Sequence, residues 1–115
     1  MFVQKNNLQF VATKSMMKSP KDCQNINEVR ECIDTIDSQI IELLAQRLEY
    51  VRAVVPFKDK TVDAIIAEER RDQVLRDRRA LAQKHGLNPD IIEDIYKLLI
   101  QYFIDEEIQL LDNQK

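Results

Sequence analysis

The sequence predicts an all-α protein of three helices, with one long helix at the N-terminal side. The chain of 115 residues holds a single glycine and three prolines, whereas β-rich folds need glycine at turns where φ is positive. Apolar residues recur at steps of three and four along three separate stretches, which is the period of an amphipathic helix. A chain of this length is expected to form one domain.

Composition and charge exclude several classes of protein. Hydrophobic residues make up 44% and charged residues 32%, so we expect a folded globular domain. The formal net charge of −3 argues against nucleic-acid binding. No apolar run approaches the ~20 residues that span a bilayer, so we expect no membrane association. Two cysteines and one histidine predict reduced thiols in a cytoplasmic protein, with no metal site.

Residues 1–17 are predicted to form a flexible N-terminal tail, because their apolar stretch is broken and makes a poor secretory signal. The helical domain is expected to span 18–115. It opens with a turn-like run, Ser19-Pro20-Lys21-Asp22. Asn25 or Asn27 can then cap the first helix, because a short side-chain oxygen accepts a hydrogen bond from an unpaired backbone N–H.

The first helix is predicted to run from Val29 to Pro56, which should kink or end it. This stretch covers roughly 26 residues, or ~39 Å of helix at 1.5 Å per residue. Its apolar line consists of Ile33, Ile36, Ile40, Leu43, Leu44, Leu48, Val51, Val54 and Val55. Residues 59–63 are short and polar, and we expect a loop there.

The second helix is predicted from about Ala67 to His85, and Gly86 occupies the position where a left-handed residue usually ends a helix. Asn88 and Pro89 then supply the cap and first turn of the third helix, with Asp90 favourable near its positive end. The third helix carries apolar residues on nearly every side between Ile91 and Ile104, so it must be buried all round. Together with the length of the first helix, this predicts an obligate homodimer whose long helices share one core.

Two charged residues interrupt apolar lines. Arg47 follows Ile36, Ile40 and Leu43 at steps of four, three and four, and a buried arginine needs an anionic partner. The alternative is an arginine whose stem lies on the surface or pairs with a glutamate. Glu107 follows Phe103 by four residues, and a partly buried carboxyl of this kind is a functional-site candidate. Exposure to water near a fraying helix end is an equal alternative.

Three further basic residues are candidates whose local environment suggests simpler roles. Arg30 can form a helical i,i+4 pair with Asp34, worth about 0.3–0.5 kcal/mol. Lys58, after Pro56, can be an ordinary solvated lysine. Arg70 begins an arginine-rich run that is most simply a solvated helix face, although Arg70 at the helix start can also point into a site.

Several segments in order resemble the all-helical chorismate mutase family, and within it the isochorismate pyruvate lyase branch that forms salicylate. These segments are KSPKDC, INEVRECIDTIDSQIIELLAQRLEYV, the FK pair, EERRDQVL and HGLNPDIIEDIYKLLIQYFIDEE. The resemblance covers residues 18–112. It implies an intertwined homodimer of three-helix chains, with two sites built from both chains, acting on a small dicarboxylate, chorismate or isochorismate, without a cofactor.

The resemblance also implies roles for individual residues. Arg30 matches the arginine that reaches into the partner's site, and Arg47 matches the one that binds a substrate carboxylate from its own chain. Lys58 matches the lysine on the segment that closes the site, and Arg70 matches the arginine at the start of the second helix. Glu107 falls where the lyase branch usually carries glutamine. Pro56 and the long stretch 59–67 also depart from that branch.

The chemistry expected of such a site is pericyclic and needs no nucleophile. Arginines clamp the carboxylates of the substrate, while a cation and a second donor stabilise charge on the ether oxygen. We assign these catalytic roles to Lys58 and to protonated Glu107, since an ionised carboxylate cannot donate. The single domain and KSPKDC favour the lyase, whereas Glu107 and the long 59–67 stretch favour a dedicated mutase. A non-catalytic helical dimerisation module is the remaining alternative.

Overall fold

A computed structural model describes residues 17–58 and 67–113. The described residues form helices and turns, with no strand among them, which confirms the predicted all-α class. The predicted loop at 59–63 and all but the last residue of the predicted tail lie outside the described residues. The chain divides into two compact units, Met1–Arg47 and Leu48–Lys115.

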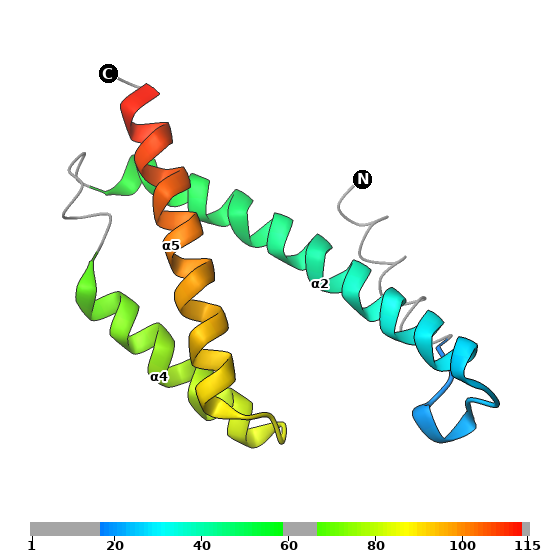
Figure 1. The fold of residues 1–115 in the computed structure, drawn as a ribbon. Helices are drawn as coiled ribbons and strands as arrows, with labels where there is room; N and C mark the ends of the chain where they lie inside the picture. The colour runs from blue at the N-terminus through cyan, green and yellow to red at the C-terminus, as the bar shows by residue number, and fades with distance from the viewer. Residues whose placement is uncertain (1–16, 59–66, 114–115) are drawn as a thin grey trace. The chain divides into compact units, whose positions relative to one another are not determined.

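The first unit contains a short turn and most of the long helix (Figure 1). A 3₁₀ turn, η1 (Pro20–Asp22), precedes the helix α2 (Ile26–Val54) of 29 residues. The Oδ1 atom of Asn25 accepts a hydrogen bond from the Glu28 N–H at 2.9 Å. Asn25, and not Asn27, is therefore the residue that caps α2.

The long helix ends where proline was expected to end it. Pro56 lies within a 3₁₀ turn, η2 (Val55–Phe57), directly after the last residue of α2. Proline has no N–H to continue the helical ladder, so the chain leaves the α conformation there. The backbone N–H of Lys58 closes the turn by donating to the Val55 carbonyl at 3.2 Å.

The other two helices, α4 (Glu68–Lys84) and α5 (Pro89–Asn113), lie side by side in the second unit (Figure 1). Gly86 between them has φ +75°, the left-handed conformation predicted for it. The Asn88 Oδ1 atom accepts hydrogen bonds from the N–H groups of Asp90 and Ile91, at 2.9 and 3.2 Å. The predicted end of α4 and the predicted start of α5 are thus confirmed.

A charged cluster ties α4 to the beginning of α5. The guanidinium of Arg79 donates to Asp90 Oδ1 at 2.8 Å and to Glu93 Oε1 at 3.0 Å. Lys97 lies 3.0 Å from the other Glu93 oxygen. The hydrogen bond with Lys97, followed by that with Arg79, lowers the pKa of Glu93. Arg79 therefore fastens the two helices together, rather than belonging only to a solvated face.

The buried core of the second unit is small. Its apolar members are Val55, Val74, Ala82, Ile100, Phe103 and Leu111. They come from η2, α4 and one face of α5, spaced so that Ile100, Phe103 and Leu111 lie on the same side of the helix. The residue that η2 contributes to this core is Val55, at the start of the turn.

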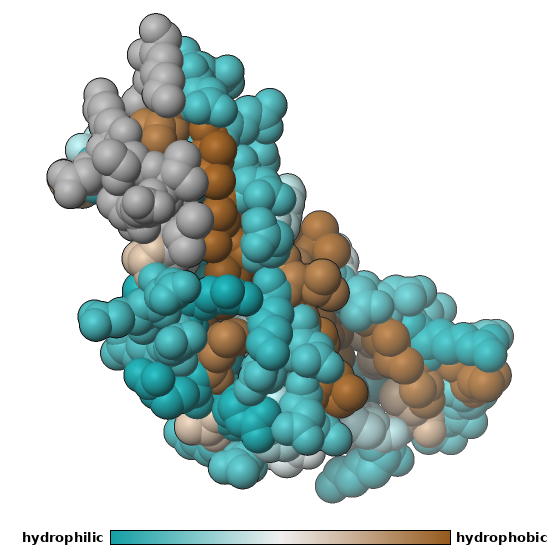
Figure 2. Space-filling view, turned by 60° about the vertical axis from the view of Figure 1, so that its left-hand side comes forward, coloured by the Kyte–Doolittle hydropathy of each residue, from teal (hydrophilic) through white to brown (hydrophobic). Residues whose placement is uncertain are grey.

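Many large apolar residues remain exposed in the single chain. Figure 2 shows such side chains in brown on the visible surface. On α2 the predicted line of Val29, Ile33, Ile36, Ile40 and Leu43 is 40–50% exposed throughout. On α5, Leu98 is 75% exposed, so the prediction that this helix is buried on every side is not met within one chain. Exposed apolar lines of this extent are typical of surfaces that another polypeptide covers.

Candidate active site

Lys58 and Glu107 form an ion pair in the second unit. Lys58 Nζ lies 3.1 Å from Glu107 Oε2 and donates a hydrogen bond to it. The Lys58 side chain is 27% exposed and that of Glu107 only 9%. The structure thus brings together the two residues that the sequence predicted as catalytic, and it buries Glu107 instead of exposing it at a frayed end.

The local sequence explains how these two side chains meet. The η2 turn around Pro56 redirects the chain at the end of α2, and Lys58 follows immediately. Glu107 lies on α5 between Phe103 and Leu111, one turn from each, and all three are buried. A carboxylate on a buried helical face needs a compensating cation, and Lys58 supplies it.

A second ion pair flanks the first. Arg52, near the end of α2, lies 3.2 Å from Glu106 Oε1. Half of the Arg52 side chain is exposed, so this pair contributes little to stability on its own. The pair instead helps to position the chain. Glu106 binds the end of α2 through Arg52, and Glu107 binds Lys58, the residue directly after η2.

Arg47 and Arg30, the two predicted carboxylate ligands on α2, belong to the first unit. Arg47 is half-buried and Arg30 is exposed. Within residues 17–58, the local i,i+4 pair between Arg30 and Asp34 does not form, since no ion pair joins them. Arg30 is therefore not paired with Asp34, the partner that helical spacing suggested.

The start of α4 presents two arginines with different environments. Arg70 is exposed, whereas Arg71 is half-buried. The Nε atom of Arg71 is buried, and it has no hydrogen-bond partner among the described residues. The sequence predicted a solvated face for the arginine-rich run that contains Arg71, so the burial of Arg71 differs from that prediction. The signal available was its position three residues before buried Val74, on the same side of the helix.

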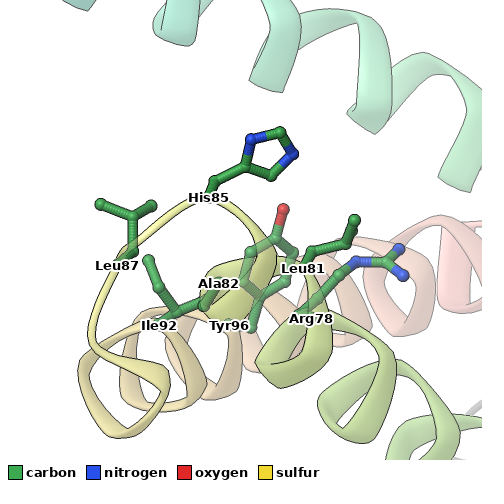
Figure 3. A pocket seen from close by; sticks show the side chains of 7 residues that line it. All are labelled: Arg78, Leu81, Ala82, His85, Leu87, Ile92 and Tyr96. Atoms are coloured by element: carbon green, nitrogen blue, oxygen red, sulfur yellow. The ribbon is translucent and has the colours of Figure 1, made fainter.

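A cavity of about 240 Å³ lies at the other end of the α4–α5 pair. Its walls are mostly apolar, and Figure 3 shows the side chains around it. The guanidinium of Arg78 sits 5.5 Å from the centre of the Tyr96 ring, a cation–π contact within this lining. None of the predicted site residues lines this cavity, which is formed by Arg78, Leu81, Ala82, His85, Leu87, Ile92 and Tyr96.

The Lys58–Glu107 pair has a defined chemical capacity. An ammonium group in a partly dry environment stabilises negative charge that develops on a nearby oxygen. While Glu107 is ionised it only accepts hydrogen bonds, so it neutralises Lys58 and repels an anion. Once protonated, the same carboxyl becomes a donor. The pair therefore supplies one cation and one proton-dependent hydrogen bond.

Comparison with known proteins identifies the family. The model of the type II chorismate mutase family matches residues 29–108. An isochorismate pyruvate lyase of Pseudomonas aeruginosa is 37% identical over 93 residues, covering 81% of this chain and 91% of that protein. The chain belongs to the type II chorismate mutase family.

Other relatives match this chain over different shares of their own length. A chorismate mutase of Methanocaldococcus jannaschii is 29% identical over 80 residues, which cover 69% of this chain and 80% of that protein. The T-protein of Haemophilus influenzae is 38% identical over 72 residues, but the match covers only 19% of its length. No helix in the described part of the chain is long and apolar enough to cross a membrane.

Proposed function

We propose that this protein is an isochorismate pyruvate lyase, converting isochorismate to salicylate and pyruvate, and that it also rearranges chorismate to prephenate. The observation that carries the proposal is the similarity to the Pseudomonas aeruginosa lyase over 91% of that enzyme's length. The Lys58–Glu107 pair supports it, because the proposed reaction uses a cation and this pair includes a partly buried ammonium group. As the sequence analysis expected, we place the activity in the cytoplasm.

The proposed enzyme is a homodimer with two shared sites. The exposed apolar line on α2, from Val29 to Leu43, and exposed Leu98 on α5 support a second copy as the covering partner. In this arrangement Arg30 of one chain enters the site that contains Lys58, Glu107 and Arg47 of the other. Its lack of a pair with Asp34 leaves its guanidinium available for a carboxylate.

The proposed reaction consists of one concerted step in each case. In the lyase reaction the ether C–O bond breaks while a ring hydrogen moves to the enolpyruvyl methylene carbon. In the mutase reaction the same bond breaks while a new C–C bond forms. Arg30, Arg47 and Arg70 hold the carboxylates and so select the compact reactive conformer. Lys58 and protonated Glu107 stabilise the negative charge that develops on the ether oxygen.

A dedicated chorismate mutase is the second candidate, and Glu107 is the observation that favours it. The lyase branch usually carries glutamine at this position, whereas some mutases of the wider family use glutamate. Because Glu107 pairs with Lys58 at 3.1 Å, the charge state of the carboxyl affects the cation directly. The two candidates share every other residue assigned here, so only the products distinguish them.

The test is a product assay with each substrate alone. Purified protein, made in a host lacking its own mutase, is incubated with chorismate or with isochorismate, and prephenate, salicylate and pyruvate are measured. The Lys58→Ala variant, prepared identically, controls for contaminating host enzymes. Salicylate and pyruvate in equal amounts, with isochorismate preferred, are expected. Prephenate alone establishes the dedicated mutase, and no product from either substrate establishes a non-catalytic module.

A further inference from the structure

The two cysteines of the chain lie close together at the start of the domain. Cys23 follows the η1 turn and Cys32 lies on the second turn of α2. The Cys23 thiol donates a hydrogen bond to the Ser19 carbonyl at 3.8 Å, and the Cys32 thiol donates to the Lys18 carbonyl at 4.0 Å. Both sulfurs therefore lie against the same two-residue segment, Lys18 and Ser19.

The electrostatics of Cys23 give an independent sign of the same proximity. Burial raises the pKa of the Cys23 thiol, and the next largest cause is the adjacent Cys32 thiol. Glu28 also raises this pKa, and the Lys18 ammonium lowers it. The Cys23 thiol is therefore protonated at neutral pH, which makes it slow to react but leaves it beside a second sulfur.

The segment that carries Cys23 is folded back on the first turns of α2. Lys18 Nζ lies 2.7 Å from Glu28 Oε2, and the other oxygen of Glu28 accepts the Gln24 N–H at 2.7 Å. Ser19 Oγ donates to Asp22 Oδ2 at 2.7 Å within the turn. The Lys18–Glu28 contact is partly exposed, so these bonds alone hold the segment weakly.

We propose that Cys23 and Cys32 are a modification site, forming a reversible intramolecular disulfide that fastens residues 18–24 to the start of α2. The oxidant is a low-molecular-weight disulfide such as oxidised glutathione. One cysteine thiolate attacks the glutathione disulfide and releases one glutathione thiolate, leaving a mixed disulfide. The other cysteine thiolate then attacks the protein sulfur and releases the second glutathione. The cysteine pair loses two electrons and two protons, and one glutathione disulfide becomes two glutathione molecules.

This site is distinct from the proposed catalytic residues and does not depend on the proposed function. Bridging requires Cα atoms within about 7 Å of each other, and both thiols donate hydrogen bonds to consecutive carbonyl groups of one short segment. Cys32 lies two residues after Arg30. The bridge therefore adds a covalent restraint next to the arginine that we propose enters the partner's site.

The experiment uses the full-length reduced chain at pH 8, equilibrated with glutathione buffers of increasing oxidised fraction, then blocked with a maleimide and weighed. We expect a product 2 Da lighter that carries no maleimide, with tryptic peptides 22–30 and 31–47 joined. Bridging is expected at a tenfold lower oxidised glutathione concentration than glutathionylation of the Cys23→Ser or Cys32→Ser variant. Separate glutathione adducts, cross-linked pairs of chains, or two maleimides at every ratio would each overturn the proposal.

Two further readouts test proximity and restraint separately. Phenylarsine oxide, which bridges adjacent thiols, should bind once per reduced chain and should fail to bind either serine variant; no uptake by the parent would contradict the proximity. Native trypsin should cleave after Lys21 at least threefold more slowly in the oxidised chain than in the reduced one. Equal cleavage rates would refute the claim that the bridge fastens the segment.

Discussion

Replacing Glu107 with glutamine should increase turnover at neutral and alkaline pH. The Glu107 carboxylate accepts a hydrogen bond from Lys58 at 3.1 Å, and it cannot donate to a substrate while ionised. A glutamine of almost the same shape can accept from Lys58 through its oxygen and donate to the ether oxygen through its NH₂ group. The substitution therefore supplies the second donor at every pH.

The size of the effect follows from the charge pair. At 3.1 Å and an effective dielectric constant of about 20, two unit charges attract by about 5 kcal/mol. Because the Lys58 side chain is 27% exposed, water screens this attraction, and its net contribution falls to about 1–2 kcal/mol. A change of 1.4 kcal/mol corresponds to tenfold in rate, so Glu107→Gln should raise kcat at pH 8 by about tenfold.

The assay measures kcat as a function of pH for the parent and for Glu107→Gln. The rate of product formation is recorded at saturating substrate. Glu107→Gln should exceed the parent in kcat at neutral and alkaline pH, because its NH₂ group donates where the carboxylate only accepts. Glu106→Gln is the matched control, because it removes the neighbouring carboxylate, which pairs with Arg52 instead. A glutamine variant no faster than the parent at neutral and alkaline pH would refute the proposed role of Glu107.

Three further predictions concern charge and backbone. Lys58→Ala should lower kcat by about 10²–10³, the usual cost of removing one such stabilising group, while Lys97→Ala, on the surface, should not; equal kcat values for both variants would remove Lys58 from the mechanism. Gly86→Ala should lower stability by about 1 kcal/mol in thermal or urea unfolding, because φ is +75° there and no atom lies within 4 Å of an added Cβ; an unchanged midpoint would contradict the left-handed cap. The pKa of Glu93 is lowered, so its ion pairs stabilise the folded state above the ordinary glutamate pKa and cease to do so as pH falls through the lowered value. The parent should therefore lose more Tm between pH 6 and pH 3 than Glu93→Gln, and equal losses would exclude this contribution.

Local signals in the sequence were sufficient to predict the helices. Asn25, Pro56, Gly86 and Asn88 act within one or two turns of themselves, through hydrogen bonds or backbone restrictions that depend little on distant residues. Their predicted effects are present in the structure at the expected positions. The same holds for the apolar lines, because helical periodicity is a local property of the chain.

The candidate site could be predicted only in part. The position of Glu107 on an apolar line left burial and exposure equally open, because the sequence does not reveal that η2 delivers Lys58 to it. The environment of Arg71 was misjudged for a similar reason, whereas Arg70 is exposed, as the solvated-face interpretation expected. Neighbouring helical positions point in directions about 100° apart, and a shift of one residue decides which arginine is half-buried.

Complementation between two inactive variants tests the shared site most directly. Arg30→Ala and Lys58→Ala chains are each purified, mixed in equal amounts, unfolded together and refolded. If each site takes Arg30 from one chain and Lys58 from the other, half of the dimers contain one intact site, and the mixture should regain about a quarter of the parental activity. Activity no greater than the average of the two separate variants would contradict a site built from both chains.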